Sequence, residues 1–488
     1  MSAIKLPKQF ALLSLILIYW LTRLVALNSL AFFLDEAIHA SWARLVWSLY
    51  PFSAAPDGRL LNVLWIAAFW PFNATVWLSR ASVILVTTVG LACVIDFARR
   101  EFSPRAAVVA ALLYTFMPLT FFFERLALAD SISAPFVAGA LWAISKSRLQ
   151  TAPTLQTAPT RAMVWAALGG VALTAAVFSK ISNLIFLCIP ILALIFLFPP
   201  RQIRRGIGLS GVMLASCFAT LFPSALIVKV IGRSDLGLSL LARKTDIPLA
   251  ALPEQIRSAG LLVLNDFAAY LPFPMWVFVL VGVAVAIWRG GRPAWFAASI
   301  LLATVGALVA RTSPGYLESR FLPAYAPLIV ILAGAGLATL SNRWPLWASA
   351  MAMILLLGSG FQFAGQSWTR PETLQLTERD RWQYITGWPS GYGFREIAAD
   401  TTARGEAVNL VTLDLGGLQR FEGYLLGRTD QVIAKQYAAG MSLAGSLLII
   451  DTPKDDQDVA ALNLDLIEMT RYPRPGGESA LVVYRVKP

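Results

Sequence analysis

The sequence predicts a polytopic α-helical membrane protein followed by a small α/β domain. Of its 488 residues, 57% are hydrophobic and 14% are charged, whereas soluble domains carry about 25% charged residues. Apolar runs long enough to cross a bilayer recur as far as residue 361, and the composition becomes polar from 362 onward. We therefore expect a membrane domain at 1–361 and a soluble domain at 362–488.

The first apolar run extends from residue 10 to 33 and contains one charge, Arg23. At a rise of ~1.5 Å per residue it spans a hydrocarbon core of ~30 Å, and an internal ion pair is the expected role of Arg23. We expect about eleven spans in total. The other ten are 75–98, 106–123, 131–145, 162–178, 181–198, 206–228, 271–288, 293–310, 321–340 and 345–361.

Lys and Arg recur in alternate turns between these runs, which is typical of cytoplasmic loops. These clusters begin with Lys5 and Lys8 and continue with Arg99, Arg100, Arg105, Lys146, Arg148, Arg161, Arg201, Arg204, Arg205, Arg289, Arg292 and Arg343. The bias predicts a cytoplasmic N-terminus and, with an odd number of spans, an external C-terminal domain. It also accounts for the net charge of +12, so we expect no nucleic-acid partner.

Two adjacent carboxylates, Asp35 and Glu36, follow the first apolar run, and His39, the single histidine, follows three residues later. A helix from this point places Glu36 and His39 on one face. The alternative is an ordinary helix start with Asp35 as N-cap. Residues 35–74 are predicted to be an external loop with two interfacial amphipathic helices, near 38–49 and 60–68, and residues 229–269 a second external loop.

The soluble domain contains four predicted strands, 407–413, 447–451, 464–471 and 480–486. Two helices, 416–426 and 455–462, are predicted between them. Small residues in the last spans, Gly334 and Gly336 among them, are expected to serve helix packing.

Ionisable residues beside apolar segments are expensive and therefore indicate function. Those predicted at the external level are Asp35, Glu36, His39, Arg59, Arg80, Arg125, Asp130, Lys180, Glu318 and Arg320. For each, a structural ion pair or an interfacial position is the alternative. Asp35, Glu36 and His39 could also bind a divalent metal, but we expect no metal and no other cofactor.

The acidic pair, the loop with interfacial helices and the many spans resemble the GT-C integral-membrane glycosyltransferases. Within that class they are similar to the protein O-mannosyltransferase and lipid A aminoarabinose-transferase branch. Four segments carry further similarity: 125–130 (Arg-Leu-Ala-Leu-Ala-Asp), 178–180 (Phe-Ser-Lys), 319–328 and 388–393 (Trp-Pro-Ser-Gly-Tyr-Gly). The sequence departs from the family at 56–61, where Arg59 stands near the position of a basic residue followed by two prolines.

The resemblance implies inverting transfer of a sugar from a polyprenyl-monophosphate donor to a hydroxyl of a lipid, glycan or protein acceptor, outside a bacterial plasma membrane. Asp35 is the expected base and Glu36 an orienting or sugar-binding residue. Arg59, Lys180 and Arg320 are candidates for the phosphate, while Arg125 and Asp130 would support the first external loop. A transporter or flippase without transferase activity is the alternative. Inverted repeats or helices broken at the membrane midplane would favour it, and the sequence shows no such repeat.

Overall fold

A computed structural model describes residues 8–47, 59–69, 76–150, 158–232, 238, 242, 248–342, 344–404, 408–425, 432–462 and 464–487. Part of the first predicted external loop, including residues 48–58 and 70–75, and the basic residues Lys5 and Arg343 lie outside this part of the chain.

The chain divides into two compact units, which are described separately. The membrane unit comprises residues 1–25, 50–62 and 83–365. The C-terminal unit comprises residues 26–49, 63–82 and 366–488. The boundary expected from composition, at 362, falls close to the last of these divisions.

The longer helices in chain order are α1 (Lys8–Leu24), α2 (Leu34–Val46), α3 (Leu60–Phe69), α4 (Val76–Glu101), α5 (Pro104–Phe116), α6 (Pro118–Glu124), α7 (Ala129–Leu149), α8 (Ala158–Ser179), α9 (Ile189–Leu192), α10 (Ile203–Gly232), α12 (Leu252–Tyr270), α13 (Phe273–Arg289), α14 (Gly291–Arg311), α15 (Ala326–Ser341), α16 (Leu346–Thr369), α17 (Glu378–Arg381), α18 (Phe394–Arg404), α19 (Leu415–Leu425) and α20 (Asp456–Leu462). Short 3₁₀ or π segments are η2 (Ile181–Cys188), η3 (Ala193–Leu197), η4 (Pro200–Gln202), η5 (Leu249–Ala251), η6 (Pro314–Tyr316), η7 (Ser319–Tyr325), η8 (Pro371–Thr373), η9 (Trp382–Thr386) and η10 (Trp388–Ser390). The strands are β1 (Val408–Thr412), β2 (Val432–Gln436), β3 (Ser446–Thr452), β4 (Leu466–Pro473) and β5 (Ala480–Val486).

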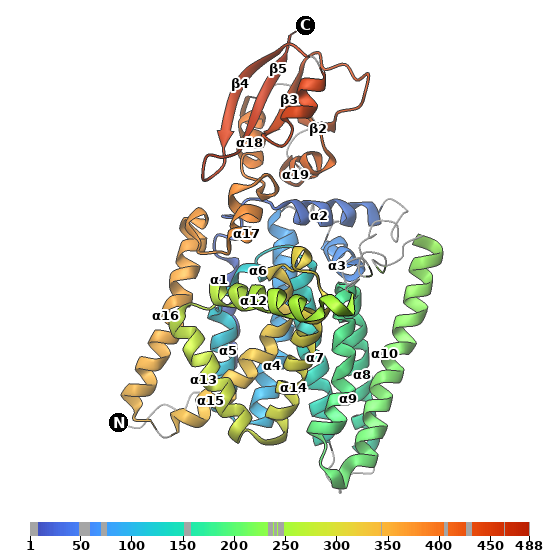
Figure 1. Cartoon of the computed structure of the whole chain (residues 1–488), viewed down its shortest axis with the longest axis vertical. Helices are drawn as coiled ribbons and strands as arrows, with labels where there is room; N and C mark the ends of the chain where they lie inside the picture. The colour runs from blue at the N-terminus through green and yellow to red at the C-terminus, as the bar shows by residue number, and fades with distance from the viewer. Residues whose placement is uncertain are drawn as a thin grey trace. The chain divides into compact units, whose positions relative to one another are not determined.

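The membrane unit is a bundle of long apolar helices, in which α8 and α10 pack side by side (Figure 1). Among the described residues, six helices are long and apolar enough to cross a membrane, or up to eight if each of two bent pairs forms one span. The chain is thus a multi-pass membrane protein, but the expected eleven spans are not confirmed. Two expected spans appear as shorter apolar helices, Leu13–Leu24 and Ile181–Leu197.

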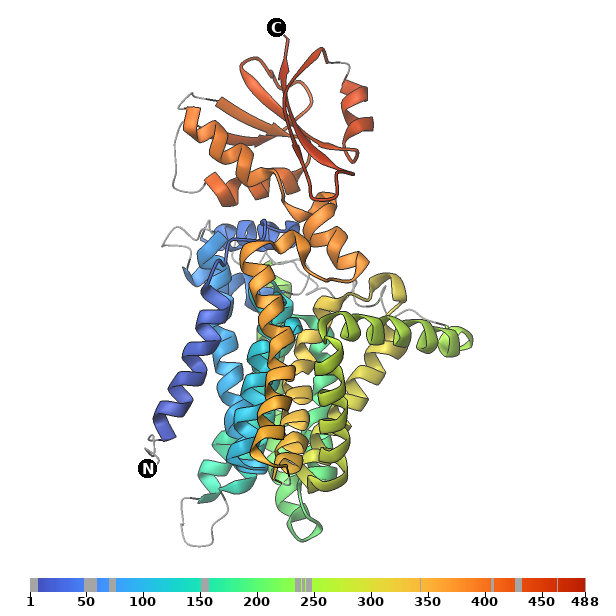
Figure 2. The ribbon, with the colours of Figure 1, turned by 90° about the vertical axis from the view of Figure 1, so that its left-hand side faces the viewer.

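Two helix pairs in this unit are sharply bent. The expected span 106–123 is broken between α5 and α6 by 57°, where Pro118 begins the second helix. The pair α12 and α13 bends by 117°, and α12 runs across the direction of α13 (Figures 1 and 2). Much of the loop predicted at 229–269 is therefore helical.

The expected ion pair of Arg23 is confirmed. Its guanidinium is fully buried, and Nε donates to Glu124 Oε2 at 3.0 Å. Nη1 donates to the carbonyl of Thr115 at 2.6 Å, and the Tyr19 hydroxyl donates to the same Glu124 oxygen at 2.9 Å. A buried charge in an apolar bundle needs such partners because the surroundings cannot solvate it.

Small residues bring helices of the membrane unit into contact, as predicted. A methyl group on Gly336 of α15 would lie 1.8 Å from the carbonyl oxygen of Gly282 on α13. One on Gly334 would lie 2.9 Å from the carbonyl oxygen of Ala106 on α5. Backbone therefore approaches backbone on two faces of α15, which is buried along most of its length.

The soluble part of the C-terminal unit is a three-layer α/β domain. Its five-stranded sheet has the order β2-β1-β3-β5-β4, with β2, β1 and β3 parallel and β5 and β4 antiparallel. Helices α18 and α19 cover one face and α20 the other (Figure 2). Successive residues of β3 alternate between the faces: Leu447 and Ile449 pack with α18 and α19, whereas Leu448 and Ile450 pack on the side of α20.

All four predicted strands and both predicted helices of this domain are confirmed. Edge strand β2 and helix α18 were not predicted. Most of β2 is exposed, Ile433 and Lys435 included, so it lacks the buried apolar run of a central strand.

We predict that Gly336→Ala destabilises the protein, because the added methyl group forces α15 away from the carbonyl of Gly282. Overpacking of this kind costs about 1–3 kcal/mol. Thermal unfolding of the full-length protein in detergent should show a lower midpoint. Gly306→Ala in α14 is the control, since its added methyl meets nothing within 4 Å; equal midpoints for the two variants would contradict the close packing.

Candidate functional site

Residues 34–39, which we call the acidic stretch, begin α2. Phe33 is the N-cap, so Asp35 lies inside the first turn and the alternative in which Asp35 caps the helix is wrong. Glu36 Oε2 accepts from the backbone N–H of Phe33 at 3.2 Å. Glu36 and His39 are buried on one face, as predicted, while Asp35 is half-buried.

Arg80 of α4 holds this helix start in place, and both groups are fully buried. Its Nε and Nη2 donate to Glu36 Oε1 and Oε2 at 2.9 and 2.8 Å, a two-point pairing of planar groups. Both oxygens of Glu36 are therefore occupied by a cation. This geometry favours the orienting role for Glu36 rather than contact with a sugar.

The same guanidinium explains why the first helix is shorter than expected. Arg80 Nη1 donates to the carbonyls of Leu27 and Leu30 at 3.0 and 2.9 Å, and Nη2 donates to that of Ala31 at 3.0 Å. These carbonyls turn toward a charge instead of continuing a helix, so α1 ends at Leu24 and not at residue 33.

Within the C-terminal unit, α2 packs against α19 of the soluble domain. The Tyr424 hydroxyl accepts from the backbone N–H of Phe32 at 2.8 Å, and the two rings meet edge to face at 6.0 Å. Arg44 pairs with Glu422 at 2.8 Å on the exposed side. The acidic stretch and the soluble domain are therefore packed together within the C-terminal unit.

The membrane unit gathers five of the remaining ionisable candidates. Asp130 lies in the first turn of α7, and Lys180 follows α8 at the predicted break before η2. Their side chains form an ion pair that is largely buried. Arg59 and Arg320 both act electrostatically on this pair, and Arg320 itself pairs with Glu318. We call Arg59, Asp130, Lys180, Glu318 and Arg320 the cation cluster.

Aromatic and polar side chains complete the surroundings of Lys180. Its ammonium lies 3.4 Å from the centre of the Phe321 ring, and Asn183 donates to Ser133 at 2.8 Å beside it. The cavity that these residues share with Asp130 and Tyr325 has a volume of about 20 Å³, which holds roughly one water molecule. Asn183 and Phe321 were not predicted; polar Asn183 within an apolar run was the available signal.

Arg125 has a structural role in the membrane unit. It donates to the carbonyls of Thr22 and Val25 at 3.2 and 2.8 Å, and its guanidinium lies 5.1 Å from the ring of Phe121. Arg125 thus supports the end of α1, where the chain leaves toward the acidic stretch. These contacts do not reach the first external loop at 35–74, so the predicted support of that loop by Arg125 stays a prediction.

The candidates accordingly form two groups. Arg59, Asp130, Lys180 and Arg320 come together in the membrane unit, whereas Asp35, Glu36 and His39 belong to the C-terminal unit. Among the described residues, no three His, Cys, Asp or Glu side chains are arranged to hold a metal ion.

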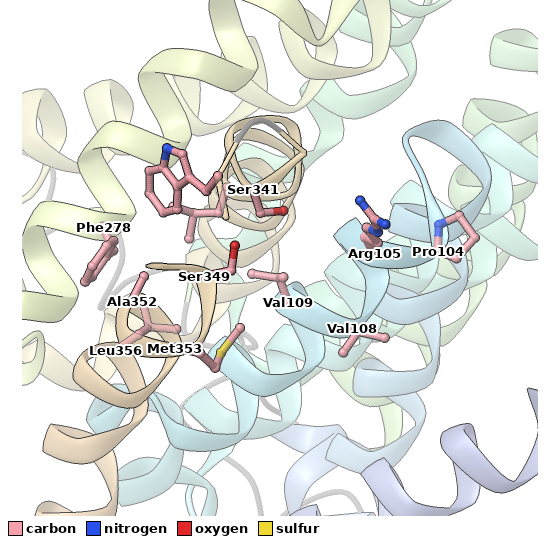
Figure 3. A pocket seen from close by; sticks show the side chains of 12 residues that line it. Pro104, Arg105, Val108, Val109, Phe278, Ser341, Ser349, Ala352, Met353 and Leu356 are labelled. Atoms are coloured by element: carbon pink, nitrogen blue, oxygen red, sulfur yellow. The ribbon is translucent and has the colours of Figure 1, made fainter. Parts of the chain in front are cut away.

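A larger pocket of about 400 Å³ lies in the membrane unit, between α5, α13, α15 and α16 (Figure 3). Its lining is apolar apart from a few groups such as Arg105, Ser341 and Ser349 (Figure 3), and it contains no carboxylate. Arg105 hydrogen-bonds to Asn342. We therefore assign no acid–base chemistry to this pocket.

No protein-family profile and no curated protein matches the sequence. Solved structures do match. ArnT from Cupriavidus metallidurans bound to undecaprenyl phosphate superimposes with a TM-score of 0.63 at 14% identity, over 98% of each chain. The apo oligosaccharyltransferase of Archaeoglobus fulgidus gives 0.54 at 12% identity, over 89% of this chain and 65% of that one. The arabinofuranosyltransferase AftD from Mycobacteria gives 0.50 at 13% identity, over 99% and 40%. The chain thus has the fold of the GT-C glycosyltransferases, as predicted.

We predict that Arg80→Met strongly destabilises the protein, because it leaves the Glu36 carboxylate buried without its cation. Removing one partner of a buried pair costs about 3–5 kcal/mol. The control is Arg44→Met, which breaks an exposed pair within the same unit and should cost less than about 1 kcal/mol. Thermal unfolding of both variants measures the difference; similar midpoints would refute a structural role for Arg80.

Proposed function

From the GT-C fold and the cation cluster, we propose that the protein is an inverting glycosyltransferase. It moves a sugar from a polyprenyl-monophosphate donor to a hydroxyl of a lipid, glycan or protein acceptor on the extracytoplasmic side of the membrane. The observation that carries the proposal is the cation cluster, which brings three cationic side chains together beside the start of α15. The likeness to ArnT bound to undecaprenyl phosphate supports a lipid phosphate as the ligand.

The charges of the cluster suit a phosphate. Lys180 pairs with Asp130 and Arg320 pairs with Glu318, and the Arg59 guanidinium acts electrostatically on the first of these pairs. Arg320 offers a planar fork for two phosphate oxygens, and Lys180 a compact point charge. A phosphate would compete with Asp130 for Lys180 as negative charge develops on the leaving group.

An apolar groove in the same unit suits an isoprenoid chain. It has a volume of about 540 Å³ and is lined by side chains of α12, α13, α14 and α15, with Leu332 of α15 among them. Helix α15 continues directly from η7, the segment that carries Arg320. Such a groove would bury hydrocarbon while the phosphate stays at the charged end of α15.

Asp35 is the proposed base, because it is half-buried whereas Glu36 is committed to Arg80. The acceptor oxygen bonds to the anomeric carbon and gives its proton to the Asp35 carboxylate. The bond from that carbon to the phosphate oxygen breaks, and polyprenyl phosphate leaves with the electron pair. The anomeric configuration inverts because attack and departure occur on opposite faces.

One observation favours the alternative, a transporter or flippase. Among the described residues two apolar helix pairs, α5–α6 and α12–α13, are sharply bent, and transporters carry helices that are interrupted near the membrane midplane. Turnover distinguishes the two functions, since a transporter releases no polyprenyl phosphate from the donor.

We predict that Lys180→Ala and Arg320→Ala each weaken binding of polyprenyl phosphate about tenfold or more, even without a sugar, because each removes a charge-assisted contact. Lipid binding can be measured by native mass spectrometry. Arg257→Ala, in an exposed pair on α12, is the control. Lys180→Met combined with Asp130→Asn removes both charges of the buried pair, so it separates lost binding from lost stability. Unchanged binding in Lys180→Ala, in Arg320→Ala and in the double variant would exclude the cluster as the phosphate site.

We predict that Asp35→Asn lowers turnover about a hundredfold or more while polyprenyl phosphate still binds, because the amide keeps the shape of the side chain but accepts no proton. Asp458→Asn, on exposed α20, should retain full turnover. Normal turnover of Asp35→Asn would remove Asp35 as the base.

Prolonged chelation tests the metal alternative. We expect activity to persist after chelation. Loss of activity that one specific ion restores would assign Asp35, Glu36 and His39 to a metal site instead.

A further inference from the structure

The soluble domain contains a pocket of about 300 Å³ that the proposed transfer reaction does not use. It lies wholly within the C-terminal unit, between the segment that precedes α18 and two loops of the sheet. Its lining residues are Trp382, Thr386, Gly387, Trp388, Pro453, Lys454, Glu478 and Ser479.

Two tryptophans form one wall of the pocket. The rings of Trp382 and Trp388 lie 6.1 Å apart at 86°, and 42% of Trp382 is exposed. Gly387 permits this arrangement, since a methyl group there would lie 2.6 Å from the Trp382 ring. Among the described residues neither indole N–H has a hydrogen-bond partner, so each ring offers an apolar face together with a donor.

The pocket lies at a position in the sheet where α/β domains bind ligands. Asp414 follows β1 and Lys454 follows β3, and these neighbouring parallel strands end at the same edge. From β1 the chain continues to β2 on one side, while β3 lies on the other. Such a switch in direction leaves a crevice beyond the carboxyl ends of the strands.

The charges in this crevice disfavour an anion. Lys454 donates to Asp414 at 2.6 Å and to Asp455 at 2.8 Å. Burial alone would raise the pKa of Asp414, but hydrogen bonds from Lys454 and from the N–H of Gly417 hold it below its usual value. Burial lowers the pKa of Lys454, yet its two carboxylate partners raise it above its usual value. Both groups are therefore charged near neutrality, and exposed Glu478 adds a further carboxylate.

Hydrogen bonds within and behind the lining hold the walls of the pocket in place. Buried Arg420 of α19 donates to the carbonyl of Trp388 at 2.7 Å, and its guanidinium lies 4.1 Å from the ring of Phe394. The Ser479 hydroxyl donates to the carbonyl of Thr386 at 2.7 Å. The aromatic wall is thus preorganised, which lowers the entropy lost on binding.

We propose that this pocket binds a neutral sugar residue. A sugar ring presents C–H groups on one face, which stack on an indole, and hydroxyls around its rim. The carboxylate of Glu478 can accept from sugar hydroxyls, and the indole N–H groups can donate to them. That the bound sugar is part of the acceptor glycan rests on the proposed transferase; the binding itself does not.

The test uses the full-length protein in lipid nanodiscs, since common glycosidic detergents would themselves occupy the site. Neutral trisaccharides of glucose, galactose and mannose are probed by saturation-transfer NMR and calorimetry, without any donor lipid. We expect at least one of them to bind, and Trp388→Ala and Trp382→Ala each to weaken that binding tenfold or more. Glu478→Gln should weaken binding several-fold.

Two controls lie on β4 of the same domain, outside the pocket: Met469→Ala for the aromatic changes and Glu468→Gln for the carboxylate. Neither should alter binding. Absence of binding by all three glycans, or binding that survives both tryptophan variants, would overturn the proposal. Tighter binding of inorganic phosphate or a nucleotide would overturn it in favour of an anion site. Because no donor is present, failure here leaves the transferase proposal untouched, and failure of transfer leaves this site untouched.

Discussion

A charged group buried in an apolar chain must find its partners within that chain, and this constraint organises both compact units. In the C-terminal unit, Arg80 satisfies Glu36 and three backbone carbonyls at once. In the membrane unit, Arg23 does the same for Glu124 and two carbonyls of the α5 segment. Each guanidinium has five donors in a fixed plane, so each fixes several chain segments rather than one.

The helical class and the strands of the soluble domain could be predicted because they depend on local patterns. Apolar runs of span length and strands such as β3, buried on both faces, leave direct marks in sequence. The end of α1 left no such mark. Residues 25–33 are as apolar as the helix before them, and the guanidinium that donates to the carbonyls of Leu27, Leu30 and Ala31 belongs to Arg80, far along the chain.

The site was predictable in part for a similar reason. Asp130, Lys180 and Arg320 stand out because charges beside apolar runs are rare, and the structure brings them together. Their pairing could not be read from the sequence, since it depends on how α7, α8 and η7 pack. Glu36 illustrates the limit of prediction from sequence. It is adjacent to Asp35 and has the same charge, and the sequence does not show that Glu36 is the one that pairs with Arg80.

The contacts of Arg80 also impose an order on biosynthesis. Glu36 lies 44 residues before Arg80, and at about 5–20 residues per second this length of chain takes roughly 2–9 s to translate. During that interval the first helix can already enter the membrane. The Glu36 carboxylate at the start of α2 does not yet have Arg80, the partner with which it is buried in the folded protein. The nascent segment must wait in a hydrated environment until α4 emerges, so the acidic stretch matures after the second long helix is made and not with the first.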